Sequence, residues 1–263
     1  MAPHTAAAFQ PFVLEFLRRW YPDRALVASA HPEIIVLDDD VELGLQNLRV
    51  RIGSLDEAQH EAAIREHFDE IFRSLADRLS PSAAWEIAQN LVKVQLLPTE
   101  YPLEDVPTRH VGPDVLSAVV EPAGKVHLHV KRNSMKTWGV TEAQVWEQAE
   151  INLLAAGTGL PFRAFGPQSE VLVLSTGDGF DSARLLLQSI RYEIAKRLGS
   201  PFLAAIPNRD FLIVWPADVP RELSSQLRAK TQQYFDEYPY PLSRNRYRAT
   251  VDYLEADTSW PEF

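Results

Sequence analysis

The feature that most constrains the fold is a group of short apolar runs in the second half of the chain. Residues 171–174 are Val-Leu-Val-Leu, which suits a strand buried on both faces and is too short for a helix. Residues 202–206 and 211–215 are two more apolar runs, joined by a segment that contains Pro207 and Asn208, residue types favoured in turns. We therefore expect one strand and, further along the chain, a hairpin in the core of a sheet.

Between the first run and the hairpin, the sequence predicts a helix over residues 182–198. Its apolar residues recur at spacings of three and four, and Gly199 follows where a left-handed residue would end the helix. Asp178 and Asp181 precede it beside two glycines that can adopt positive φ, so either carboxylate can accept hydrogen bonds from the free amides of the first turn. We expect this helix to cover the sheet.

Two segments of this region carry a resemblance to a known family. Residues 178–185 read Asp-Gly-Phe-Asp-Ser-Ala-Arg-Leu, and residues 204–212 read Ala-Ala-Ile-Pro-Asn-Arg-Asp-Phe-Leu. Together they resemble the YtpQ-like family of uncharacterised bacterial proteins. The resemblance covers residues 141–254 and fades over the first hundred residues, where only the order of elements matches. It implies a shared fold, and it carries over no catalytic or binding residue because none is established for that family.

The remaining periodicities place further helices and strands on both sides of this region. Thr141, with Gln144 three residues later, is typical of a capping box that opens a helix. The order hairpin, helix, strand recurs near residues 33–97, 115–175 and 202–254, without a repeat in the residues themselves. The sequence therefore predicts an α+β fold of mixed, mostly antiparallel sheets with covering helices.

A proline-rich segment divides the predicted fold. Residues 98–114 contain four prolines with acidic residues between them, a composition that favours an irregular connection. We expect an N-terminal α+β unit over 1–97, this connection over 98–114, a C-terminal α+β domain over 115–254 and an unstructured tail over 255–263. Loops held by rigid elements often carry function, so Tyr101, Arg109 and His110 are candidates, with an ordinary surface connection as the alternative.

Composition limits the compartment and the partners. The chain has no cysteine, which excludes disulfides, thiol nucleophiles and thiolate zinc sites and fits a reducing cytoplasm. No apolar run approaches the roughly 20 residues that span a bilayer, and the first residues lack the pattern of a signal peptide. A net charge of −10 argues against nucleic acid and anionic membranes as partners. We expect a cytoplasmic protein.

Six polar residues in two turns are the candidate ligand-binding residues. They are Asp178, Asp181, Arg184, Asn208, Arg209 and Asp210. Acids, a guanidinium and an amide brought together could position a water molecule or hold a polar ligand. The alternative is that these residues only cap a helix and shape turns, since Asp and Asn are favoured there anyway.

Histidines offer the main metal hypothesis. His127 and His129 alternate with aliphatic residues, so both imidazoles leave one face of a predicted strand at residues 125–130. A metal site would need a third ligand, for which His110 is the candidate; the alternative is an exposed polar face. We expect no metal and no cofactor.

The functional expectation follows from what the chain lacks. It contains no Gly-x-Ser-x-Gly, His-Glu-x-x-His, Gly-x-Gly-x-x-Gly or Gly-Lys-Ser/Thr pattern. The first hypothesis is a non-catalytic adaptor that acts by contacting another protein, which an exposed apolar patch would favour. The second is a metal-independent enzyme or a binder of a small polar ligand at the two turns, which a deep pocket joining the turns, with a carboxylate whose pKa is raised by burial, would favour.

Overall fold

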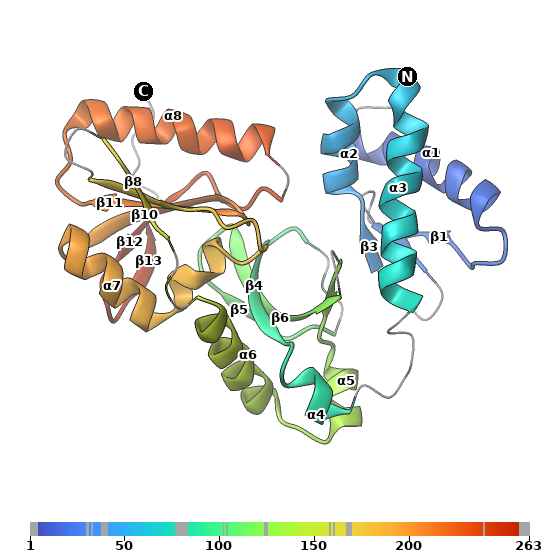
Figure 1. Cartoon of the computed structure of the whole chain (residues 1–263), viewed down its shortest axis with the longest axis horizontal. Coiled ribbons are helices and arrows are strands. Elements are labelled where there is room, and N and C mark those ends of the chain that lie inside the picture. The colour runs from blue at the N-terminus through green and yellow to red at the C-terminus, as the bar shows by residue number, and fades with distance from the viewer. Residues whose placement is uncertain are drawn as a thin grey trace. The chain divides into compact units, whose positions relative to one another are not determined.

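The computed structural model divides the chain into two compact units, Met1–Leu79 and Ser80–Phe263. It describes residues 5–29, 32, 34–37, 42–76, 84–101, 103, 105–123, 126–157, 159, 161–166, 170–238 and 240–257. None of the helices within these ranges has the length and apolar composition of a membrane span. Each unit has its own sheets and helices (Figure 1).

The N-terminal unit combines three helices with a small antiparallel sheet of order β1-β2-β3 in its described part. Its elements are α1 (Ala6–Trp20), β1 (Val27–Ala28), β2 (Ile34–Val36), β3 (Glu42–Gly44), α2 (Gln46–Gly53) and α3 (Glu57–Ala76). Phe9, Val13 and Leu17 recur at helical spacing on α1 and are buried, as are Ile64 and Phe68 on α3. Burial of one apolar stripe on each helix gives this unit its core.

The described residues of the C-terminal unit form two antiparallel sheets. The four-stranded sheet consists of β4 (Lys93–Pro98), β5 (Thr108–His110), β6 (Val115–Ala123) and β7 (Val126–His129). The strands β4, β5 and β7 each pair with β6. The six-stranded sheet has the order β13-β12-β10-β11-β9-β8. Its strands are β8 (Arg163–Phe165), β9 (Val171–Leu174), β10 (Phe202–Asn208), β11 (Phe211–Pro216), β12 (Arg246–Ala249) and β13 (Leu254–Asp257).

Helices cover both faces of the six-stranded sheet (Figure 1). The helices of this unit are α4 (Trp85–Ala88), α5 (Arg132–Trp138), α6 (Glu142–Ala156), α7 (Gln188–Leu198) and α8 (Arg221–Glu237), with a short 3-10 helix, η2 (Ser182–Leu186). Alternate residues of a strand point to opposite faces, so Leu203 and Ile213 pack with Leu227 of α8. Ala204 and Leu212 face the other way, into a larger core shared with α6, α7 and the four-stranded sheet.

These observations confirm the α+β class and the central strand-and-hairpin arrangement. β10 and β11 form the predicted antiparallel hairpin, with Ala204 opposite Val214, and β9 pairs with β11. The capping box that opens α6 is present, since Thr141 and Gln144 bond each other's backbone amides. The predicted helix over 182–198 is wrong in one respect, because Leu187 is extended and separates η2 from α7.

The boundary between the two units differs from the predicted one, because it follows Leu79 and not residue 97. The strand β4 was assigned to the N-terminal unit, yet it pairs along its whole length with β6, from Lys93 opposite Val120 to Pro98 opposite Val115. The expected irregular connection contains β5, and the expected tail begins with β13, which pairs with β12. Residues 258–263 of that tail lie outside the described residues. The pairing of β4 with β6 crosses the predicted connection, whereas β5 and β13 each pair in a hairpin with a neighbouring strand of the chain.

Candidate functional site

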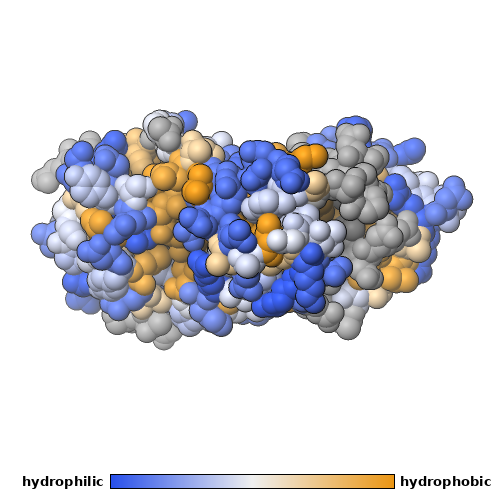
Figure 2. All heavy atoms as spheres, turned by 90° about the horizontal axis from the view of Figure 1, so that it is seen from below, coloured by the Kyte–Doolittle hydropathy of each residue, from blue (hydrophilic) through white to orange (hydrophobic). Residues whose placement is uncertain are grey.

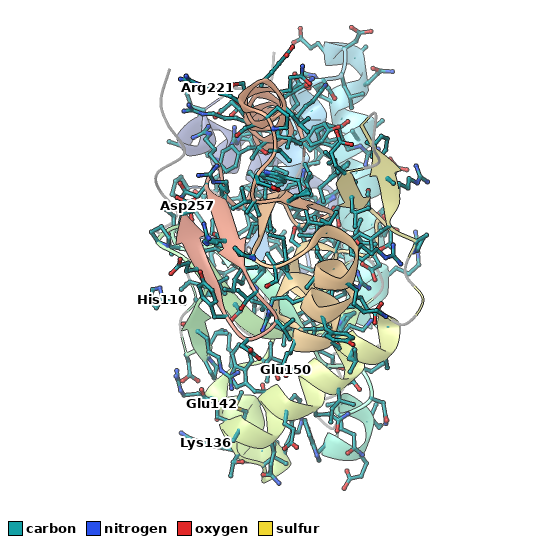
Figure 3. The ribbon with its side chains drawn as sticks, turned by 90° about the vertical axis from the view of Figure 1, so that its left-hand side faces the viewer. His110, Lys136, Glu142, Glu150, Arg221 and Asp257 are labelled. Carbon is teal, nitrogen blue, oxygen red and sulfur yellow. The ribbon has the colours of Figure 1, made fainter. Side chains whose placement is uncertain are left out.

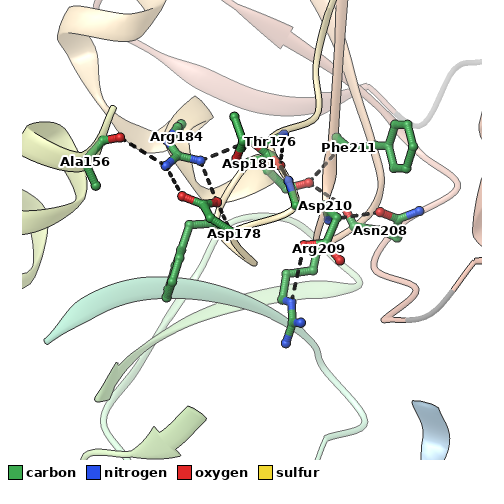
Figure 4. Close-up of polar contacts among 12 residues, drawn as sticks. Ala156, Thr176, Asp178, Asp181, Arg184, Asn208, Arg209, Asp210 and Phe211 are labelled. Carbon is green, nitrogen blue, oxygen red and sulfur yellow. Dashed lines mark hydrogen bonds and ion pairs between the residues drawn. The ribbon is translucent and has the colours of Figure 1, made fainter. Parts of the chain in front are cut away.

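Ser182 joins the two turns whose candidate residues are labelled in Figure 4. The amide of Ser182 donates to the carbonyl of Arg209 at 3.2 Å. Its hydroxyl, which is fully buried, bonds the carbonyls of Asn208 and Phe211, the latter at 2.8 Å. Because both ends of the β10–β11 turn are held by one side chain, the six predicted residues lie in one region of the unit.

Arg184 is the centre of the first turn. Its side chain is completely buried and donates to Asp178 and Asp181, with Nη1 3.0 Å from Asp178 Oδ1 and 3.1 Å from Asp181 Oδ1. Its Nη2 atom also lies 3.4 Å from the carbonyl oxygen of Ala156 at the end of α6. Two carboxylates and one guanidinium thus form a hydrogen-bonded network inside the fold, and that network ties the turn to α6.

Asp181 does not cap a helix, contrary to the sequence prediction. Its carboxylate turns back toward β9 and accepts from the amides of Thr176 at 2.8 Å and Gly177 at 3.1 Å, and from the Thr176 hydroxyl at 2.8 Å. The residue itself is helical in backbone conformation and makes no cap bond. The amides that Asp181 bonds therefore belong to the loop before the helix and not to its first turn.

The pKa values of the two acids in this network are shifted in opposite directions. Burial tends to raise the pKa of Asp178, but the hydrogen bonds and charge of Arg184 outweigh burial and hold that pKa below its usual value. Burial raises the pKa of Asp181 despite the bonds from Thr176 and Gly177. The network therefore stabilises the loop, and Asp181 and Arg184 are enclosed within it.

Asn208 shapes the turn, as the alternative interpretation of the six residues predicted. Its side chain is buried, its Oδ1 accepts from the amide of Asp210 at 2.9 Å, and its Nδ2 lies 3.4 Å from the carbonyl oxygen of Tyr234 on α8. These bonds fix the turn and engage the polar atoms of the amide. Asn208 therefore positions its neighbours.

Arg209 instead borders Gly179 together with His127 of the four-stranded sheet, and Asp210 follows Arg209 in the turn. A Cβ atom placed on Gly179 would lie 2.9 Å from His127 Cε1 and 3.3 Å from Arg209 Nε, so His127 and Arg209 both border this glycine. Arg209 Nε is 3.8 Å from Asp210 Oδ1, beyond hydrogen-bond distance. The Arg209 guanidinium also lies 3.3 Å from the centroid of the Tyr240 ring.

Phe180 links the same residues to β4. The His127 ring stacks on Phe180 with centroids 4.9 Å apart and an interplanar angle of 15°. Lys93 Nζ lies 4.9 Å from the Phe180 centroid. We call His127, Arg209, Asp210, Phe180 and Lys93 the Gly179 cluster. Lys93 was missed in the sequence, because nothing local to it indicates that β4 lies beside the turn.

Burial controls the ionisation of the cluster. It lowers the pKa of His127 to about 3, helped by the charges of Arg209 and Lys93, so the imidazole is neutral near pH 7. Burial likewise lowers the pKa of His129 to about 4. It raises the pKa of Asp210, against the opposing charge of Arg209. A neutral imidazole can donate or accept at Nδ1, depending on its tautomer.

The three histidines are not brought together as the metal hypothesis required. His127 stacks on Phe180, His129 lies 5.4 Å from the Tyr101 ring, and His110 is exposed on β5. Across the described ranges, no group of three or more His, Asp or Glu side chains is placed to hold a metal ion. The expected exposed polar face is also wrong for His127 and His129, since both imidazoles are largely enclosed.

Comparison with known proteins shows a distant similarity to uncharacterised proteins of Bacillus. The UPF0354 protein of Bacillus cereus (strain AH820) is 28% identical over 123 residues, which are 46% of this chain and 44% of that protein. The UPF0354 proteins of Bacillus thuringiensis (strain Al Hakam) and Bacillus mycoides (strain KBAB4) are 27% and 26% identical over the same shares. The match thus covers less than half the length of these relatives. No family model and no solved structure matches.

Proposed function

We propose that the Gly179 cluster binds a small polar ligand without a metal ion. The observation that carries the proposal is a set of three buried polar atoms, His127 Nδ1, Arg209 Nε and Asp210 Oδ1, that make no hydrogen bond among the described residues, although Arg209 Nε and Asp210 Oδ1 form an ion pair at 3.8 Å. A buried polar group left unsatisfied costs roughly 1–3 kcal/mol, so such groups are kept where something else bonds them. A ligand with both donor and acceptor groups complements this set.

The charges around these atoms favour a ligand that carries one negative charge, because two cations face one acid. Lys93 and Arg209 supply two cations, and Asp210 supplies an acid whose pKa is raised by burial. The second acid nearby, Asp178, is engaged by Arg184. A small hydroxy acid offers the required donors and acceptors together with this charge, whereas a carboxamide or a purine offers the donors and acceptors without it. The Arg184 network supports the proposal by holding the loop that carries Gly179 and Phe180.

The binding test uses saturation-transfer NMR on the full chain with a panel of carboxamides, hydroxy acids and purines. We expect at least one compound to bind, and Arg209→Gln and His127→Gln each to weaken its affinity about 10-fold or more, because each removes a bond to a buried polar atom. The matched control is Arg244→Gln: Arg244 also lies over an aromatic ring, 4.0 Å from the centroid of Phe235, but it is exposed and pairs with Asp236 of α8. Equal binding by all variants, or binding by none of the panel, would reject the proposal.

A second candidate function is contact with a protein partner, which a different observation favours. Ile151 and Leu154 on α6 are 52% and 41% exposed, and Tyr192 on α7 is 52% exposed. Figure 2, which views the molecule from the side of α6, shows apolar side chains gathered in a band on that face. Exposed apolar patches of this kind mark sites of protein contact.

The partner hypothesis has its own test. Affinity capture from the native host with the wild-type chain and with an Ile151→Lys, Leu154→Lys double variant should recover a protein that the variant loses, because two charges on an apolar interface must be desolvated. Arg209→Gln serves as the control and should still recover it. Retention of the same protein by the double variant argues against this face as the contact surface.

A further inference from the structure

A pocket beside α6 is separate from the Gly179 cluster. Its volume is about 210 Å³, and its walls come from β4, β5, β6, α6 and η2. Pockets for drug-sized ligands measure roughly 300–1,000 Å³, so this pocket suits a smaller molecule. Arg109 and His110 also line the pocket. Both lie in the proline-rich segment, where the sequence predicts candidate residues, and neither belongs to the Gly179 cluster. Figure 3 labels His110 on β5 and Glu150 on α6.

The pocket wall is mainly aliphatic and aromatic. Leu153 and Trp146 are buried residues of α6, Leu186 ends η2, Leu187 follows it, and Val94 comes from β4. The Trp146 Nε1 atom is buried without a hydrogen-bond partner in the described part of the chain. Such a wall favours an apolar group about the size of one side chain, with a nearby acceptor that could reach the indole.

Two opposite charges on the pocket wall are partly exposed. Arg109 Nη1 lies 3.0 Å from Glu150 Oε1, and their side chains are 53% and 50% exposed. The Arg109 guanidinium also lies 4.0 Å from the Trp146 ring centroid, so Trp146 orients it. An exposed ion pair of this kind contributes little to stability, and its members remain able to bond a ligand.

We propose that this pocket binds a zwitterionic amino acid with an apolar side chain. The ligand carboxylate bonds Arg109, its ammonium bonds Glu150, and its side chain occupies the aliphatic wall. Because Arg109 and Glu150 together carry no net charge, a ligand that carries both charges leaves each of them paired. A ligand with only one charge displaces one member of the Arg109–Glu150 pair and leaves that member without an opposite charge. This inference goes beyond the proposed function, and it uses none of the residues of the Gly179 cluster.

The experiment is isothermal titration calorimetry of the full chain with L-leucine. Two analogues of matched shape, 3-methylbutylamine and 4-methylpentanoate, lack the carboxylate and the ammonium respectively. We expect L-leucine to bind and each analogue to bind about 10-fold more weakly or worse, because a hydrogen bond between charged groups contributes about one factor of ten in affinity. An analogue that binds as tightly as L-leucine overturns the proposal, and so does the absence of L-leucine binding up to about 10 mM.

Variants then assign the binding to the pocket. Arg109→Gln and Glu150→Gln should each weaken L-leucine binding about 10-fold with an unchanged melting temperature, since both side chains are half exposed. Glu147→Gln is the matched control, an exposed glutamate on the same helix that does not line the pocket. Arg209→Gln should bind L-leucine normally, which separates this site from the Gly179 cluster. Full binding by Arg109→Gln and Glu150→Gln overturns the assignment.

Discussion

Replacing Arg184 with methionine is expected to lower the free energy of unfolding by about 3–5 kcal/mol, the range found when one partner of a buried ion pair is removed. Methionine keeps much of the packing volume, so the loss comes mainly from charge. Asp178 and Asp181 would lose the hydrogen bonds that Nη1 and Nη2 now supply. The measurement is urea denaturation followed by circular dichroism at pH 7.

The pH dependence of this loss distinguishes a charge effect from a packing effect. In the wild-type protein Arg184 holds the pKa of Asp178 below its usual value of 3.8, so that bond contributes fully above this pH and is lost as the pH falls below it. In the variant, Asp178 and Asp181 lack the opposite charge of Arg184, and taking up protons removes the cost of burying them in the ionised form. The difference in unfolding free energy between wild type and Arg184→Met should therefore shrink as the pH is lowered from 7 toward 4.

The control for Arg184 is Arg163→Met, which removes an exposed arginine from the edge strand β8. This change should alter the unfolding free energy by less than about 0.5 kcal/mol at either pH, as surface substitutions usually do. An Arg184→Met loss below about 1 kcal/mol, or one that is independent of pH, would mean that water already compensates the two acids. The role of the network in holding the Gly179 loop would then need another explanation.

The sequence predicted those parts of the fold that depend on near neighbours in the chain. The hairpin β10–β11 follows from two apolar runs with turn residues between them, and the start of α6 follows from Thr141 and Gln144. The break at Leu187 was not predictable in the same way. Apolar residues continue at helical spacing across it, and only the burial of Arg184 and the bonds of Arg191 to the carbonyls of Leu185 and Leu186 show why the helix stops there.

The candidate site was predicted in part for the same physical reason. The acids and arginines of the two turns were recognisable as polar residues beside apolar runs, but their separate roles depend on partners far along the chain. Arg184 meets the carbonyl of Ala156, and Arg209 meets the ring of Tyr240. His127 reaches Phe180 from another sheet, so its burial and lowered pKa had no local signal.

Replacing Gly179 with alanine is expected to lower the free energy of unfolding by about 2–5 kcal/mol, the sum of two costs. The residue has φ +84°, where a side chain costs about 1–2 kcal/mol. Its Cβ would also lie 2.9 Å from His127 Cε1, which forces a shift in a packed region at about 1–3 kcal/mol. Because His127 and Arg209 both border this atom, binding at the Gly179 cluster should weaken as well.

Gly177→Ala separates the backbone cost of Gly179→Ala from its packing cost. Gly177 has φ +74° and nothing within 4 Å of its Cβ position, so Gly177→Ala should show the backbone cost alone. Adding His127→Ala removes the ring that the new Cβ meets, and a double-mutant cycle should then recover about 1–3 kcal/mol of coupling between residues 127 and 179. Equal losses for Gly177→Ala and Gly179→Ala, with no coupling to His127, would show that the ring can move away freely. His127 would then not be held firmly enough to orient a ligand, because only a fixed imidazole places its free nitrogen at a defined point.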